Sequence, residues 1–191
     1  MMKSCLISIL VSLVSFTAAW GQASGTQVTE TDSTLTLRNS KVRVEFPKGE
    51  AFDISKLTLN GKELVLSKGY NTVPWTLTYK GPQGENPVLF PSHGEYAGWA
   101  KTTKDGHVAI AFKWNMRLTY QDLVPVVMTV SLPGDSELAY WDIQAGTPDG
   151  WLVSNTQFPR ITVTRPDKAK LITSAGWGAE YNLSNPQVYT S

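Results

Sequence analysis

The chain has one cysteine and two histidines among its 191 residues, and it has almost no excess of either charge. Cys5 lies in an apolar N-terminal run, so the rest of an exported chain would have to fold without disulfides. His93 and His107 are far apart in the sequence and have no cysteine beside them, so the usual zinc-ligand spacings are missing. We therefore expect no metal site.

The signatures of several enzyme classes are also missing. No Gly-x-Ser-x-Gly segment is present to form the sharp strand-to-helix turn that presents a serine nucleophile. No glycine-rich loop precedes a predicted helix, so the sequence contains no predicted binding site for a nucleotide phosphate. Beyond the N-terminal run, apolar residues do not recur at helical spacing over a useful length. These absences argue against a serine hydrolase and against nucleotide binding, and we expect no cofactor.

The first 21 residues have the order of a secretory signal peptide. Lys3 precedes an apolar run, and the small residues Ala18 and Ala19 follow it. We predict cleavage after Gly21, with Ala23 as a second option, and a secreted or periplasmic protein. A retained membrane anchor is the alternative, but the run is shorter than the roughly 20 apolar residues that a spanning helix needs.

Residues 22–191 are predicted to form a single domain. Of the 17 basic residues only Lys3 lies in the signal segment, so 16 basic residues remain against 16 acidic ones. This balance offers no basic patch, so we expect no nucleic-acid partner and no membrane partner after signal removal. The end of the sequence reads as the approach to a further segment, which predicts a fragment or an N-terminal module of a longer protein.

Residues 107–143 read as the centre of an antiparallel sheet. Alternate positions of a strand face the same side, and three successive segments (107–114, 124–132 and 137–143) alternate in this way. A Pro-Gly-Asp-Ser turn at 133–136 separates the last two. In the third segment we place Trp141 inward. The residues predicted to be buried between two sheets are Val108, Ile110, Phe112, Val126, Met128 and Val130.

Further short strands are predicted on both sides of this centre. Segments 34–38 and 41–46 flank a turn at Asn39, and segments 52–59 and 62–66 flank Asn60-Gly61, a strong hairpin signal. Residues 73–79, 151–155 and 159–164 also read as strands. Residues 80–105 read as a long loop, or as a loop that holds one edge strand around 95–101. The predicted fold is all-β, an antiparallel two-sheet β-sandwich preceded by a signal-peptide helix.

Paired carboxylates are the one catalytic arrangement that sequence spacing cannot exclude, because glycoside hydrolysis needs two acids placed in three dimensions. The candidates are Glu95, Asp149 and Glu180. Asp149 lies in Thr-Pro-Asp-Gly, which is typical of a turn. The other two are single acids in polar surroundings, for which a solvated surface position is the more common explanation. We therefore assign no catalytic residue.

Trp99 and Trp177 are the candidate carbohydrate-binding residues. Both lie beside glycines, in Ala-Gly-Trp-Ala and Ala-Gly-Trp-Gly-Ala, outside the clearest alternating segments. A flat aromatic face suits the apolar C–H patches of a sugar ring. The competing interpretation is that the two side chains close the ends of the sandwich, because large aromatic residues are common in cores.

The order of these segments resembles a known type of domain. The phrases are LTLRNSKVRVEF, ISKLTLNGKEL, PWTLTY, VAIAFKW, VVMTVSLPGDSELAYWDIQ and LVSNTQFPRI. They resemble the N-terminal β-sandwich domain, related to the galactose-mutarotase-like supersandwich, of secreted bacterial glycoside-hydrolase-like proteins. In such proteins the domain commonly precedes a catalytic (β/α)8 barrel.

The resemblance implies a non-catalytic accessory domain of a protein that acts on polysaccharide. Its partner would be carbohydrate or a downstream catalytic domain, and no catalytic residue carries over because the barrel is absent from this sequence. A stand-alone secreted carbohydrate-binding module is the alternative. A mutarotase-like enzyme is a third interpretation, which normally needs a histidine and an acid on one concave sheet.

Overall fold

The computed structural model describes residues 25–49, 53–64, 66, 73–120, 122–161, 170–173 and 179–182. The predicted signal peptide at 1–21 lies outside these residues. Within them the chain is almost entirely antiparallel β-structure, and its one helix is a short 3-10 turn, η1 (Pro91–His93). None of the described helical structure is long and apolar enough to cross a membrane. The predicted all-β fold is confirmed.

Four antiparallel sheets contain the described strands. The first has the order β1-β2-β3-β4-β5 and the second the order β11-β10-β9-β8, while β12-β6-β7 and β13-β14 form two smaller sheets. The strand bounds are β1 (Gln27–Glu30), β2 (Thr34–Arg38), β3 (Val42–Pro47), β4 (Lys56–Leu59), β5 (Lys62–Leu64), β6 (Thr76–Lys80), β7 (Val88–Leu89), β8 (Gly94–Lys104), β9 (His107–Arg117), β10 (Leu123–Leu132), β11 (Tyr140–Ala145), β12 (Leu152–Gln157), β13 (Lys170–Thr173) and β14 (Ala179–Asn182).

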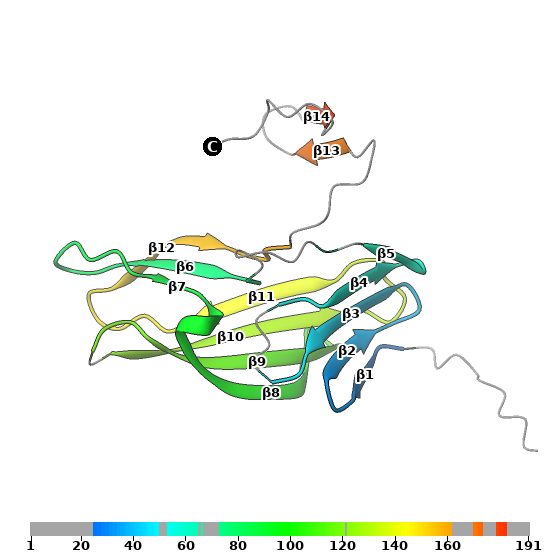
Figure 1. Ribbon diagram of the computed structural model, residues 1–191, viewed down its shortest axis with the longest axis horizontal. Helices are drawn as coiled ribbons and strands as arrows, with labels where there is room; N and C mark the ends of the chain where they lie inside the picture. Colours follow the sequence, from blue (N-terminus) through cyan, green and yellow to red (C-terminus); the bar gives the residue numbers. More distant parts are fainter. Residues whose placement is uncertain are drawn as a thin grey trace, which may run out of the picture.

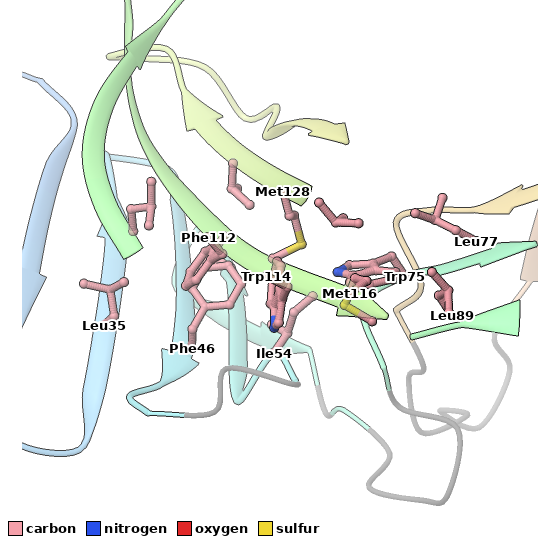
Figure 2. Packing of buried hydrophobic residues seen from close by; sticks show 14 of the residues in the cluster. Leu35, Phe46, Ile54, Trp75, Leu77, Leu89, Phe112, Trp114, Met116 and Met128 are labelled. Atoms are coloured by element: carbon pink, nitrogen blue, oxygen red, sulfur yellow. The ribbon is translucent and has the colours of Figure 1, made fainter. Parts of the chain in front are cut away.

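The β8–β11 sheet forms one layer of the sandwich, and two sheets cover its inner face. Figure 1 shows the β1–β5 sheet over one half of this layer and the β6-β7-β12 sheet over the other half. Phe46 of β3 contacts Phe112 of β9, with ring centroids 4.7 Å apart. Trp75, just before β6, meets Trp114 of β9 edge to face at 5.5 Å. A single apolar core therefore joins the sheets, as Figure 2 shows.

The alternation along β9 and β10 produces this core. Five of the six residues predicted to be buried are almost fully enclosed, and the sixth, Val108, is partly buried and packs against the core. Trp141 also packs inward, with its ring 6.1 Å from that of Phe46. The predicted inward positions are thus confirmed.

Two hairpin turns have the backbone that their sequences favour. Asn60 and Gly61 have φ values of 49° and 74°, and they join β4 to β5 as predicted. Asp105 and Gly106 have φ values of 52° and 79°, and they join β8 to β9. Asparagine and aspartate tolerate this left-handed conformation better than most residues, and glycine adopts it freely.

Asn39 closes the β2–β3 hairpin and also ties it to a distant turn. Its Oδ1 accepts hydrogen bonds from the backbone N–H groups of Lys41 at 2.8 Å and Val42 at 2.6 Å. Its Nδ2 donates to the carbonyl oxygens of Pro133 at 2.7 Å and Ser136 at 2.8 Å, in the β10–β11 turn. One side chain therefore holds two turns that are almost a hundred residues apart in sequence.

The largest difference from the predicted strands lies in residues 80–105. This segment contains the short strand β7, the turn η1 and then β8, which is eleven residues long rather than a short stretch around 95–101. β8 contains polar, small and glycine residues because it is the edge of its sheet and buries little of its surface. Asp105-Gly106, which was not used in predicting the strands, is a dipeptide that favours such a hairpin turn.

Candidate functional site

The outer face of the β8–β11 sheet carries small side chains that are almost inaccessible. Ala109 and Ala111 of β9 lie beside Ser131 and Thr129 of β10, and these four residues are between 0% and 8% exposed. All four alternate with the core residues, so they face away from the core. Outer positions of a sandwich strand are usually solvated and polar, so this shielded floor of small residues is unusual.

Two pairs of larger side chains flank this floor. The rings of His107 on β9 and Tyr140 on β11 stack at an interplanar angle of 8°, with centroids 6.3 Å apart. Lys104, the last residue of β8, lies 3.7 Å from Asp142 of β11, measured from Nζ to Oδ2. Gln144 donates from Nε2 to the same Oδ2 at 3.2 Å. Aromatic, cationic, anionic and amide groups therefore meet over one part of the sheet.

The ion pair shows that the sheet curls toward this face. Lys104 and Asp142 belong to the two opposite edges of a four-stranded sheet, and β9 and β10 lie between them. Flat strands about 4.8 Å apart would place β8 and β11 roughly 14 Å from each other. The Cα atoms of β8 and β10 also approach within 8 Å although β9 separates them. The outer face is therefore concave along the diagonal that joins these two residues.

A second surface feature lies at the other end of the same sheet. A hollow of about 440 Å³ is lined by residues 122–125 at the start of β10 and residues 146–148 after β11. Tyr120 lies in the turn before β10 and is 91% exposed. The Asp122 carboxylate accepts a hydrogen bond from the Thr119 hydroxyl at 2.8 Å, so part of its hydrogen-bonding capacity is used within the turn.

The structure places Trp99 in an edge strand, which was one of the two interpretations of residues 80–105. The residue lies within β8, opposite Phe112 of β9. It is partly buried and packs against the core cluster. The glycine before Trp99 belongs to this irregular strand, which has a register shift between Tyr96 and Gly98. Trp177, the other predicted carbohydrate platform, lies outside the described residues.

Tyr96 lies on the same strand, and its ring is 5.7 Å from that of Trp114. Burial raises the pKa of Tyr96 from 10.0 to about 12. Burial also raises the pKa of Tyr79, whose hydroxyl donates to the carbonyl oxygen of Gly146 at 2.8 Å. Both phenols are therefore held in their neutral forms.

We expect the free energy of unfolding to fall as the pH rises from about 10 to about 12, because the unfolded chain then releases a proton that folded Tyr96 retains. Below pH 10 this contribution is fully present. In Tyr96→Phe the free energy of unfolding should decrease less over this pH range. Some decrease should remain, because burial also raises the pKa of Tyr79. Urea unfolding between pH 8 and pH 12 gives the free energy of unfolding of the parent chain and of Tyr96→Phe. Equal pH dependence in the two would contradict the assignment.

The candidate carboxylates do not form a described catalytic pair. Glu95 is exposed on β8, at one edge of the central sheet, while Asp149 follows β11 at the other edge. Asp149 lies in a turn in which the N–H of Trp151 donates to Pro148 and Gly150 has a φ of 79°, as its sequence predicted. Glu180 belongs to β14, and its side chain is not described.

The two histidines are also separated. His93 belongs to η1 before β8, and His107 begins β9, so the β8–β9 hairpin places them at its opposite ends. Eleven residues of strand span roughly 36 Å. Within the described part of the chain, no three His, Cys, Asp or Glu side chains are grouped in a way that could hold a metal ion.

Sequence reasoning missed the groups on the concave face. No role was predicted for Tyr140, and His107 was considered only as a metal ligand without suitable partners. The register of β10 and β11 places Tyr140 beside Ser131 and Asp142 beside Thr129, and no sequence pattern specified that register. Alternation within each strand gives the face of a side chain, but it does not show which residues of other strands lie beside it.

Comparison with known proteins found one similar curated protein, named "Putative glycoside hydrolase", from Bacteroides thetaiotaomicron. It is 35% identical to this chain over 182 residues, which cover 94% of the chain. The same match covers 27% of the relative, so the chain spans about a quarter of the length of that protein. No protein-family model matches the chain, and no solved structure matches it.

Proposed function

We propose that this chain is the non-catalytic N-terminal β-sandwich part of a secreted glycoside-hydrolase-like protein that acts on polysaccharide. The observation that carries the proposal is the match of nearly the whole chain to only 27% of a relative with that name. Most of the relative lies outside the matched segment and has room for a separate catalytic domain. The signal-peptide pattern at residues 1–21 supports export to the periplasm or the exterior.

The described side chains favour this role over catalysis by the chain itself. Glycoside hydrolysis requires two carboxyl groups about 5–9.5 Å apart. Glu95 and Asp149 are both exposed to solvent, and Asp149 is part of a turn, so neither lies in an enclosed site.

A stand-alone secreted carbohydrate-binding module is the second candidate. The observation that favours it is the concave face of the β8–β11 sheet, where an exposed tyrosine ring lies beside charged and amide groups. Such a face would serve a binding module and an accessory domain equally well. The two candidates therefore share the prediction that this chain does not hydrolyse glycans.

We expect purified residues 22–191 to release no reducing sugar from a panel of plant and host polysaccharides. The full-length Bacteroides relative, assayed on the same panel, provides the comparison for a protein that contains the matched segment and the remainder. If the chain alone hydrolyses a glycan, and Glu95→Gln, Asp149→Asn or Glu180→Gln abolishes that activity, the proposal of a non-catalytic domain is wrong.

A further inference from the structure

Tyr140 offers an accessible aromatic face on the concave side of the sheet. The residue is 52% exposed, and its parallel contact with His107 braces the ring without burying it. A pyranose ring has a face of C–H groups that packs well against such a flat, partly apolar surface. Trp99, by contrast, has its ring against the core.

Hydrogen-bonding groups follow Tyr140 along the same strand face. Asp142 and Gln144 lie two and four residues farther along β11, so they point to the same side of the sheet. The Asp142 side chain is 37% exposed and the Lys104 side chain 38% exposed. Lys104 and Asp142 are 3.7 Å apart, which is longer than a good hydrogen bond, so both groups keep capacity for a ligand's hydroxyls.

The charges on this face favour a neutral ligand. Lys104 and Asp142 lie side by side with opposite charges and similar exposure, so together they present no net charge to attract a uronic acid. A neutral sugar needs donors and acceptors in fixed directions, which an ammonium, a carboxylate and an amide supply together. The concave diagonal between Lys104 and Asp142 would let one sugar unit meet groups from both edges of the sheet.

We propose that the outer face of the β8–β11 sheet binds a neutral pyranose unit of a glycan. The ring of Tyr140 stacks on the C–H face of the sugar, and Asp142, Gln144 and Lys104 bind its hydroxyls. The inference rests on the proposed function only in taking polysaccharide as the material that the protein meets. It gives that function a specific contact surface, distinct from the predicted tryptophans.

The test is a titration of the purified chain with neutral oligosaccharides, including gluco-, xylo-, manno- and galacto-configured chains, and with uronate oligosaccharides. Binding is followed by calorimetry and by affinity electrophoresis in gels that contain the parent polysaccharides. We expect a neutral glycan to bind, Tyr140→Ala to weaken binding at least tenfold and Asp142→Ala to weaken it severalfold. Both positions are accessible, so the variants should unfold at nearly the same temperature as the parent chain.

Tyr120→Ala is the matched control, because Tyr120 is also an exposed tyrosine but lies beyond the far end of β9. It should bind as the parent chain does. Loss of binding in Tyr120→Ala with full binding in Tyr140→Ala would overturn the proposal, as would binding of uronate chains alone or of no glycan. These failures leave the hydrolysis result unaffected, so they are distinguishable from a failure of the proposed non-catalytic role.

Discussion

Replacing Phe112 by alanine is expected to lower the free energy of unfolding by about 3–5 kcal/mol. The side chain is 1% exposed and lies between the layers, with Phe46 at 4.7 Å on one side and Trp114 at 6.3 Å along its own strand. Removing the ring takes away its apolar burial and leaves a cavity that two large neighbours cannot fill without moving. Urea unfolding followed by tryptophan fluorescence measures the difference.

Lys113→Ala is the control for this variant. Lys113 is the next residue of β9 and is exposed on the opposite face of the same sheet. Its replacement by alanine changes the strand propensity at this point and leaves the core intact. We expect the free energy of unfolding to change by about 0.5 kcal/mol or less. A loss below about 1 kcal/mol in Phe112→Ala would be typical of an exposed site and would contradict the packing described here.

Asn39→Ala is expected to cost about 2–4 kcal/mol, which is large for a polar residue in a turn. The variant loses the two bonds that its amide oxygen accepts within the hairpin and the two that its amide nitrogen donates to the β10–β11 turn. Three of the four bonds, those with Val42, Pro133 and Ser136, are partly buried, so leaving these backbone groups unpaired adds a desolvation penalty. Chemical denaturation of the variant and the parent chain gives this value.

Asn39→Asp separates the local role of this side chain from its distant one. The carboxylate can still accept from the N–H groups of Lys41 and Val42, but it has no donor for the carbonyl oxygens of Pro133 and Ser136. If the link between the two turns carries most of the stability, the aspartate variant is destabilised nearly as much as the alanine variant. Wild-type stability in Asn39→Asp would show that the hairpin bonds alone matter.

The inward residues of the central sheet could be predicted because burial imposes a period of two on a strand. Phe112, Met128 and Trp141 were placed correctly on that basis alone. The edge strand β8 could not be predicted in full because half of its surroundings is solvent, which accepts polar and small residues without a pattern. The same lack of a pattern left Trp99 outside the clearest alternating segments.

The residues that meet on the concave face could not be predicted from the sequence, for a different physical reason. It depends on which residues of non-adjacent strands meet, and that depends on register and on the curl of the sheet. Tyr140 and His107 are thirty-three residues apart in sequence, and nothing in either segment specifies that their rings are parallel. The link from Asn39 to Pro133 has the same character, since asparagine was recognisable only as a turn residue.

The irregularity within β8 affects how this molecule meets other copies of itself. An edge strand of eleven residues would offer a long row of N–H and C=O groups to any extended peptide. The register shift between Tyr96 and Gly98, where Gly98 has a φ of 101°, divides that row into two shorter pieces that are out of phase. Lys101 and Lys104 add charge along the second piece. This edge therefore discourages sheet extension between molecules and the aggregation that would follow from it.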